Sequence, residues 1–514
     1  MKLPLLYFSI AITLTCFLLA PGVWWGDSLN AYIQSVSGIY GAAQPVFMAL
    51  FLKCTRFFLP GSLLPFLIFV TLYFAGFALL IFYLIKNKYL APVLFFSFSF
   101  CPLLFANIGV IQTESFQLAL LSAFIALTVL FYRYEGVHRK KYFAGLVVLL
   151  GLFSLVRYDT LHISLLLSYW LGYTWVKKHN RKVIFITAGL FFIFKISATF
   201  LDSLVNIPQE LKPEMRNSLL VADIAAISAQ SKTNYIPDYC WQPVIPNKER
   251  TVEKIIYGQN NWSNSFYSYI YNIDPSIGLF TYSTSSHTEE LFMTWFKVVA
   301  KHPFLFFKYH LTVFSYLVFN DNFNMGIWSG LKDSHVNHSR LLIEKNEAVD
   351  SFLVKHSNRF AYRNGNLFFD KDDTPITPKE ENALLQLAGN RRAADVVWMK
   401  WYSYIPAKTY NTANSIAEKY VNPSFELFKW YFRGLCMLAP YFLALVIFLF
   451  YAPWLKRGYY RFTYILLCCC GIVHLLLRLL ILTDPVYRFG MLTILFAFFA
   501  FVILVADKLN KQTA

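Results

Sequence analysis

Ionisable side chains gather where the apolar runs of this sequence end. Asp27 stands just past the first run, behind the tryptophan pair Trp24 and Trp25. A carboxylate in such a place can take a proton from an attacking hydroxyl group, and a guanidinium can hold a phosphate through two parallel hydrogen bonds. The other members of the group are Glu114, Arg157, Asp159, Asp484, Arg488 and Arg478, which follows His474 by one helical turn. We therefore expect acid–base or phosphate chemistry at the depth of a lipid headgroup.

Each of these residues also has a structural interpretation. Arg157 and Asp159 can satisfy each other's charge at a turn, and Glu114 can stabilise a helix N-terminus through the backbone dipole. Arg488 can reach from the membrane interface into water. Arg478 lies deeper within its apolar run and needs a partner there, either Asp484 or a phosphate.

The elements that must position these residues are membrane-spanning helices. The 514-residue chain is 57% hydrophobic and 19% aromatic, and its mean hydropathy is +0.46, which is too apolar for an ordinary soluble protein. The formal net charge of +17 does not indicate nucleic-acid binding, because the basic residues lie between apolar runs. A nucleic-acid-binding protein would gather them on one surface, together with aromatic side chains that stack on bases.

About 20 apolar residues cross a hydrocarbon core of roughly 30 Å. This length predicts about ten spans, at residues 4–24, 63–85, 90–107, 114–132, 143–157, 159–176, 183–204, 429–454, 462–482 and 487–506. The runs between 143 and 176 are short, and the Arg157-Tyr158-Asp159 break between them favours a tight turn at one membrane face. A pair of half-depth helices is the alternative.

The loops between the predicted spans are alternately rich and poor in lysine and arginine. Basic residues cluster in one set, which begins with Lys2 and ends with Lys508 and Lys511, and the opposite short loops hold almost none. Because Lys and Arg stay on the cytoplasmic side, we expect both termini to be cytoplasmic and the loop 25–62 and residues 205–428 to face outward. The segment 302–319 is nearly apolar enough to cross, but one further span would invert the last three. Residues 291–319 are interpreted as an amphipathic helix in the outer interface.

The sequence thus predicts a mainly α-helical membrane protein with three parts. These are an N-terminal transmembrane module (1–204), a large extracytoplasmic domain (205–428) that is α+β or mainly α, and a C-terminal transmembrane module (429–514). Within the outer domain, residues 377–400 show helical periodicity. Of the eight cysteines, Cys240 alone lies in that domain, so no disulfide framework is expected.

Several short motifs together resemble the GT-C superfamily of membrane glycosyltransferases. The first outer loop, GDSLNAYIQSVSGIYGAAQP, has the acid, Tyr, Gly and Pro of that family's first loop, with Asp27 at the position of the catalytic acid. The stretches TESFQLALL, GLFSLVRYD and PVYRFGMLTILF match three further elements, and KHPFLFFKYH matches a His-Pro helix before the last spans. The match covers about the first 205 and the last 85 residues.

The resemblance implies transfer of a sugar from a polyprenyl-phosphate donor to an acceptor hydroxyl of a glycan, lipid or protein, with inversion. Asp27 would be the general base, and Arg488, Arg478 and Arg157 would hold the donor phosphate. Because Asp27 has no acidic neighbour, we expect neither a metal nor a cofactor. The further candidates for substrate binding are Glu114, Asp159, Tyr32, Gln44, Tyr158, Asp484 and His474.

Three alternatives remain at the level of the sequence, and one of them is a receptor or scaffold whose outer domain only binds. A polymerase or ligase of polyprenyl-linked glycans would use the same kind of substrate. A lipid or glycan transporter would need charges near the bilayer midplane and repeated halves. The expected location is a bacterial inner membrane, whose lipids surround the spans.

Overall fold

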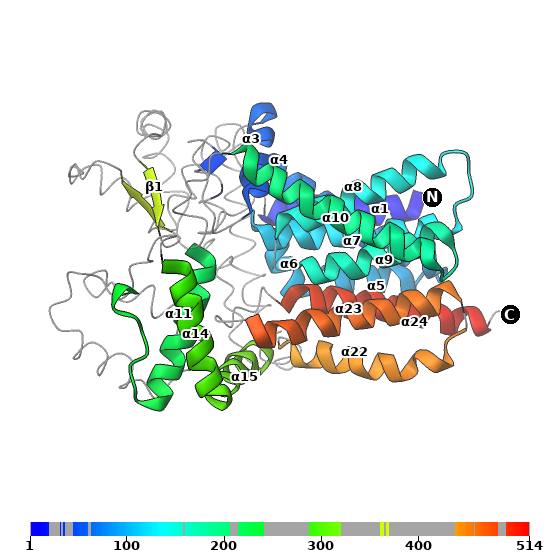
Figure 1. Ribbon diagram of the computed structural model, residues 1–514. Coiled ribbons are helices and arrows are strands. Elements are labelled where there is room, and N and C mark those ends of the chain that lie inside the picture. The colour runs from blue at the N-terminus through cyan, green and yellow to red at the C-terminus, as the bar shows by residue number, and fades with distance from the viewer. Residues whose placement is uncertain are drawn as a thin grey trace.

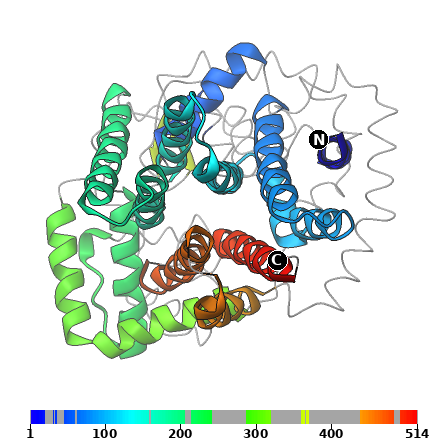
Figure 2. The same ribbon diagram turned by 90° about the vertical axis from the view of Figure 1, so that its right-hand side faces the viewer.

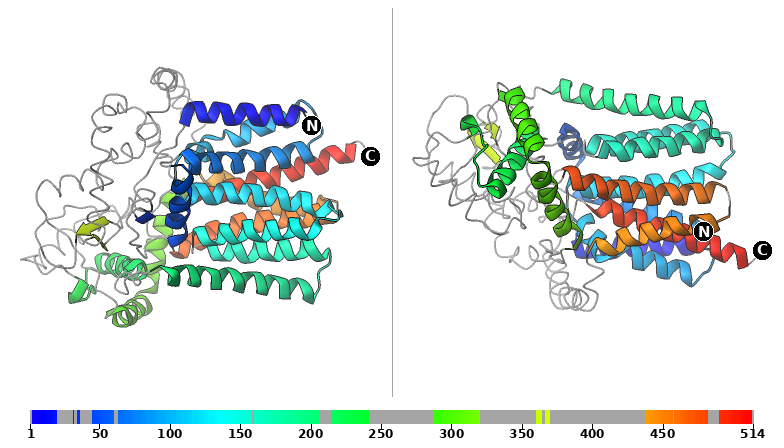
Figure 3. Two further views of the ribbon diagram at one scale, coloured as in Figure 1. Left: turned by 90° about the horizontal axis from the view of Figure 1, so that it is seen from above. Right: turned by 60° about the horizontal axis from the view of Figure 1, so that its bottom comes forward.

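The computed structural model describes residues 2–19, 31, 34–35, 45–59, 63–157, 160–205, 214–240, 287–319, 360–363, 366–369, 437–456, 458–481 and 490–512. These residues are mainly helical, as the composition predicts (Figure 1). Long helices lie side by side in a bundle, some running along it in one direction and some in the other (Figures 1 and 3). They are α1 (Lys2–Leu19), α4 (Leu63–Leu84), α7 (Thr113–Arg133), α8 (Arg139–Val156), α9 (Leu161–Val176), α10 (Arg181–Leu204), α22 (Ala439–Tyr451), α23 (Tyr459–Ile481) and α24 (Met491–Gln512).

Within the described residues, five helices are long and apolar enough to cross a membrane. They span Leu63–Leu84, Thr113–Arg133, Arg181–Leu204, Tyr459–Leu479 and Met491–Leu509. Each of the ten ranges expected from the sequence contains helix, but the remaining helices are shorter. The protein therefore has the elements of a multi-span membrane protein, and the number of ten crossings stays a prediction.

The range 90–107 is not one continuous helix. It divides into α5 (Leu90–Ser99) and α6 (Pro102–Ile108), with Cys101 in a non-helical conformation before Pro102. Proline disfavours helical backbone at the residue that precedes it, so the break follows from the sequence. At 1.5 Å per residue, the ten residues of α5 cover only about 15 Å.

The helices on either side of Arg157 are longer than half a membrane. The 18 residues of α8 and the 16 of α9 correspond to about 27 and 24 Å. They pack against each other in the bundle (Figure 1), and the turn between them lies at one of its ends. These lengths favour the tight turn over the pair of half-depth helices.

Helix α7 is the best-buried of the five candidate spans and packs closely along α4. A Cβ atom on Gly76 of α4 would come within 2.4 Å of the backbone of Ser122 on α7. Only a glycine permits this approach. The Ser122 hydroxyl donates to the carbonyl of Tyr73 across the contact, at 3.2 Å. The position and tilt of α7 are thereby tied to α4.

Three helices lie at one end of the bundle and not within it. They are α11 (Glu214–Ser231), α14 (Thr288–Lys301) and α15 (Pro303–Phe319), of which α11 and α14 run across the direction of the bundle helices (Figure 1). The buried Asp223 of α11 joins them, because it accepts a hydrogen bond from the indole N–H of Trp295 at 2.9 Å and pairs with His310 Nε2 at 3.2 Å. On α15, Val313 and Leu317 belong to the bundle's own apolar core.

The segment 291–319 is therefore two helices where the sequence suggested one. His302 ends α14, and its N–H reaches the carbonyls of Val298 and Val299. Pro303 then starts α15, because a proline is tolerated at the first helical position but not in a helix interior. An interfacial position for both helices stays a prediction.

The remaining described elements are small. Helix α3 (Val46–Phe58) lies within the predicted loop 25–62. Strands β1 (Phe360–Arg363) and β2 (Asn366–Phe369) form an antiparallel hairpin in which Phe360 is opposite Phe369. The expected helix at 377–400 and most of the expected outer domain lie outside the described residues.

Both ends of the chain lie at the same end of the bundle, with the start of α1 near the end of α24 (Figures 1 and 2). We call this the terminal end. Helices α7 and α24 begin at the opposite end, where α8 and α23 finish (Figure 1). The first residues of one pair and the last residues of the other therefore meet there.

Candidate functional site

The start of α7 is fixed by hydrogen bonds to the segment before it. The hydroxyl of Ser115 donates to the carbonyl of Asn107, at the end of α6, at 2.5 Å. The side-chain amide of Gln112 donates to the side-chain oxygen of Asn107 at 3.3 Å. Glu114 is thus held in the first turn of α7, where the helix dipole favours a carboxylate.

Glu114 pairs with Arg157. Arg157 Nη1 donates to Glu114 Oε1, and Thr113 Oγ1 donates to Glu114 Oε2 at 2.8 Å. The carboxylate is 5% exposed and the arginine side chain 16%, so the pair is largely removed from water. The carboxylate of this pair comes from 43 residues earlier in the chain. The expected pairing of Arg157 with Asp159 lies outside the described residues and stays a prediction. A buried pair of this kind is costly to break, because one charge is then left uncompensated.

A second contact fixes the turn that carries Arg157. The side-chain amide of Gln117, one turn after Glu114 on α7, donates to Thr160 Oγ1 at 2.8 Å. The Thr160 hydroxyl in turn donates to the carbonyl of Arg157 at 3.1 Å. Helix α7 therefore holds both the guanidinium and the backbone of Arg157.

Helix α23 supplies the opposite wall. His474 and Arg478 are both buried and line the same hollow, as their four-residue spacing predicts. The imidazole of His474 stacks on that of His162, in the first turn of α9, with ring centroids 5.8 Å apart. Beside them, the first turn of α24 contributes Met491 and Leu492.

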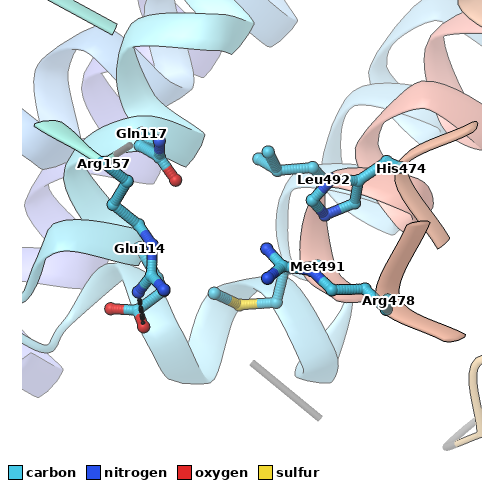
Figure 4. A pocket seen from close by; sticks show the side chains of 7 residues that line it. All are labelled: Glu114, Gln117, Arg157, His474, Arg478, Met491 and Leu492. Carbon is cyan, nitrogen blue, oxygen red and sulfur yellow. Dashed lines mark hydrogen bonds and ion pairs between the residues drawn. The ribbon is translucent and has the colours of Figure 1, made fainter. Parts of the chain in front are cut away.

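Together these side chains enclose a small hollow at the end of the bundle opposite the termini. Figure 4 shows Glu114, Gln117 and Arg157 on one side and His474 and Arg478 on the other, with the Arg478 guanidinium pointing inward beside Met491. The space between these atoms is about 230 Å³ when open solvent is counted, but the enclosed volume is only about 10 Å³. That is room for about one water molecule, so the hollow as it stands is too small for a whole sugar.

The charges around the hollow favour an anion. Among the described residues that line the hollow, two guanidiniums face one carboxylate, so their formal charges sum to one positive unit with His474 neutral. Arginine binds carboxylate and phosphate in a fork geometry, and burial strengthens that attraction because water no longer screens it. The arrangement can bind a phosphate or a similar oxyanion.

Four of the residues singled out from the sequence thus line one site: Glu114, Arg157, His474 and Arg478. The others lie outside the described residues, namely Asp27, Tyr32, Gln44, Tyr158, Asp159, Asp484 and Arg488. Their roles stay predictions.

The structure adds residues that the sequence analysis did not identify. Gln117 lies three positions after Glu114, so helical spacing alone could have placed both on one face. No such signal exists for Thr160 or His162, whose partners are 43 and 312 positions away along the chain. Met491 and Leu492 looked like any other apolar residues of a span.

No family model, curated protein or solved structure matches the chain. The comparisons therefore supply no relative from which a fold, a substrate or a residue's role could be transferred. What can be said of the site follows from its own geometry and from the sequence motifs.

Proposed function

We propose that the protein is a membrane glycosyltransferase of the GT-C type, which moves a sugar from a polyprenyl-phosphate donor to an acceptor hydroxyl on the extracytoplasmic side. One observation carries the proposal. Two arginines and a carboxylate, from helices remote in the sequence, surround a small hollow at the end of a membrane bundle. In the proposed orientation, a lipid-borne phosphate would lie at this depth.

Arg478 is the principal ligand of the donor phosphate in this proposal. Its guanidinium points into the hollow beside Met491 (Figure 4). Charge-assisted hydrogen bonds from Arg478 stabilise the phosphate as negative charge develops on the leaving oxygen. Arg157 contributes its charge from the opposite wall, and Arg488 is expected to complete the set.

Asp27 is the proposed general base. Ala31, four residues after it, is buried in the apolar core of the bundle. Helix α1, which leads to it, runs from the terminal end toward the end that holds the hollow (Figure 3).

The reaction is a single displacement. The acceptor oxygen forms a bond to the anomeric carbon, the bond from that carbon to the phosphate oxygen breaks, and the electron pair leaves with polyprenyl phosphate. The acceptor proton passes to the carboxylate of Asp27, which contributes roughly 10² to 10⁴ to the rate. Attack opposite the leaving phosphate inverts the anomeric configuration.

The test is transfer by the purified protein in lipid vesicles, with a panel of polyprenyl-phosphate sugars and the membrane glycans of the host as acceptors. Asp27→Asn should reduce the rate by at least about 100-fold and leave donor binding nearly unchanged. Glu135→Gln serves as the matched control, because Glu135 is an exposed acid at the terminal end.

Two outcomes would refute different parts of the proposal. Near wild-type transfer by Asp27→Asn would exclude Asp27 as the base while leaving the reaction in place. A wild-type protein that binds no polyprenyl phosphate and transfers no sugar would exclude the function itself.

A further inference from the structure

A second group of cations lies at the terminal end of the bundle, far along α7 from Glu114. Arg133 is the last residue of α7, Lys86 follows the end of α4, and Tyr460 lies in the first turn of α23. The Nζ atom of Lys86 is 5.3 Å from the ring centroid of Tyr83. The guanidinium carbon of Arg133 is 6.0 Å from the Tyr83 ring and 5.0 Å from that of Tyr460. We call these four residues the Tyr83 cluster.

Within the described part of the chain, neither cation of the cluster forms an ion pair. The nearby carboxylate of Glu135 is taken by Lys177, at 2.5 Å. That hydrogen bond, with the charge of Lys177, holds the pKa of Glu135 below its ordinary value. Two positive charges therefore converge on one tyrosine ring with no described carboxylate to neutralise them.

The surroundings of the cluster point to a lipid. Lys86 and Arg133 are exposed, so an anion can reach them. Leu79 lies one turn before Tyr83 on the same face of α4 and is 40% exposed, at the depth where acyl chains would lie. Tyrosines are typical of the interface between hydrocarbon and headgroups, and basic pockets between helix ends can bind acidic headgroups.

A structural role is the alternative. Cations at the last turn of a helix stabilise it through the backbone dipole, and both Lys86 and Arg133 stand at helix C-termini. This role would explain a single cation at each end. It does not explain why both cations lie over the same ring, which brings their charges together despite their repulsion.

We propose that the Tyr83 cluster binds the phosphate of an acidic phospholipid of the surrounding membrane. Arg133 and Lys86 hold the phosphate from α7 and α4, the Tyr460 hydroxyl is available as a further donor, and one acyl chain lies along Leu79. The site is separate from the hollow, and the inference does not depend on the proposed glycosyltransferase activity.

The experiment compares lipid binding by the full-length protein and two charge-matched variants. Purified protein in detergent is titrated with phosphatidylglycerol and, separately, with phosphatidylcholine, and bound lipids are counted by native mass spectrometry. Lys86→Gln/Arg133→Gln removes the two cations of the cluster. Lys140→Gln/Lys141→Gln removes two exposed cations at the same end of the bundle, in the first turn of α8.

Wild type should bind phosphatidylglycerol more tightly than phosphatidylcholine. Near a membrane surface each basic residue is worth about a fivefold factor, so the cluster variant should bind phosphatidylglycerol about 10- to 30-fold more weakly. The Lys140/Lys141 variant should lose less than threefold. An equal loss in both variants would overturn the local site in favour of diffuse attraction, and an unchanged cluster variant would overturn it outright.

A conservative variant covers the possibility that the double substitution prevents folding. Arg133→Lys keeps the charge and the helix-terminal interaction but loses the forked hydrogen bonds of a guanidinium. It should weaken phosphatidylglycerol binding several-fold while leaving phosphatidylcholine binding unchanged. Wild-type affinity in this variant would argue against phosphate recognition by Arg133.

Discussion

At the end of the bundle that holds the hollow, arginines are buried beside a carboxylate, whereas at the terminal end the cations are exposed and lie over tyrosine rings. The residue types are the same, but their surroundings differ. A buried charge needs a partner of opposite sign to be tolerated, so Arg157 has Glu114. An exposed charge is screened by water and is free to meet a mobile ligand. The buried charges of the hollow are therefore held in fixed positions, whereas the exposed cations at the terminal end can adjust to a ligand.

The largest expected contrast between the two ends concerns their ion pairs. Glu114→Gln removes the countercharge that Glu114 supplies to the largely buried guanidinium of Arg157, so we expect a loss of about 3 to 5 kcal/mol in the free energy of unfolding. Glu135→Gln breaks the exposed pair with Lys177 and should change that free energy undetectably. Denaturant unfolding in detergent micelles measures both.

A double variant sharpens this test. Glu114→Gln/Arg157→Gln removes both charges and should recover much of the lost stability, because no uncompensated charge remains. If the single variant is as stable as wild type, the buried pair contributes nothing, and the two ends do not differ in this respect.

The second contrast is in anion binding. Arg478→Gln should weaken binding of polyprenyl phosphate by about 10- to 150-fold, because hydrogen bonds to charged groups contribute about 1.5 to 3 kcal/mol each. Lys140→Gln, which removes an exposed cation at the other end, should leave that affinity unchanged. Titration of the purified protein with polyprenyl phosphate distinguishes them, and equal losses would show that the hollow is not the phosphate site.

The third prediction concerns the contact between α4 and α7, which fixes the position of α7 and thus of the charged residues at its two ends. Gly76→Ala forces a Cβ atom against the backbone of Ser122 and should destabilise the protein by about 1 to 3 kcal/mol. Gly145→Ala is the matched control in α8, because no atom lies within 4 Å of its added Cβ. The control should be neutral or slightly stabilising, since alanine favours helix over glycine. Equal stability of the two variants would mean that α7 can shift along α4.

The smallest expected effect is a difference in cysteine labelling, which tests which compartment the hollow faces. Cys54 of α3 is exposed, whereas Cys240 is buried, and burial raises the pKa of its thiol to about 12. In single-cysteine variants, a membrane-impermeant maleimide added to intact cells should label Cys54 and leave Cys240 unmodified. Labelling of Cys54 only after the cells are broken would place this end in the cytoplasm and contradict the orientation inferred from the basic loops.

The sequence predicted the helices better than their contacts. Apolar length located the bundle helices because a span must satisfy its backbone hydrogen bonds internally. The breaks before Pro102 and Pro303 were missed, although proline marks both, because the surrounding apolar run favoured a continuous helix.

The site was predictable only in part. Its four charged or titratable residues stand out against apolar sequence, which is why Glu114, Arg157, His474 and Arg478 could be singled out. The pairing of Glu114 with Arg157 could not be predicted from the sequence, because it depends on how α7 and α8 pack. The hydrogen bond between Gln117 and Thr160 could not be predicted either, because an amide and a hydroxyl 43 residues apart carry no signal in the sequence that they meet.

One helix connects the two ends. The 21 residues of α7 correspond to about 32 Å, with Glu114 in the first turn and Arg133 at the last residue. Because this rod is nearly rigid and close to the thickness of a typical hydrocarbon core, bilayer thickness governs whether both charged ends reach their own interfaces together. In vesicles of short-chain or very long-chain lipids, the two ends of α7 should therefore not both lie at their membrane surfaces. Arg133 could then contact lipid headgroups while the hollow beside Glu114 is not at the depth of its substrate, or the reverse.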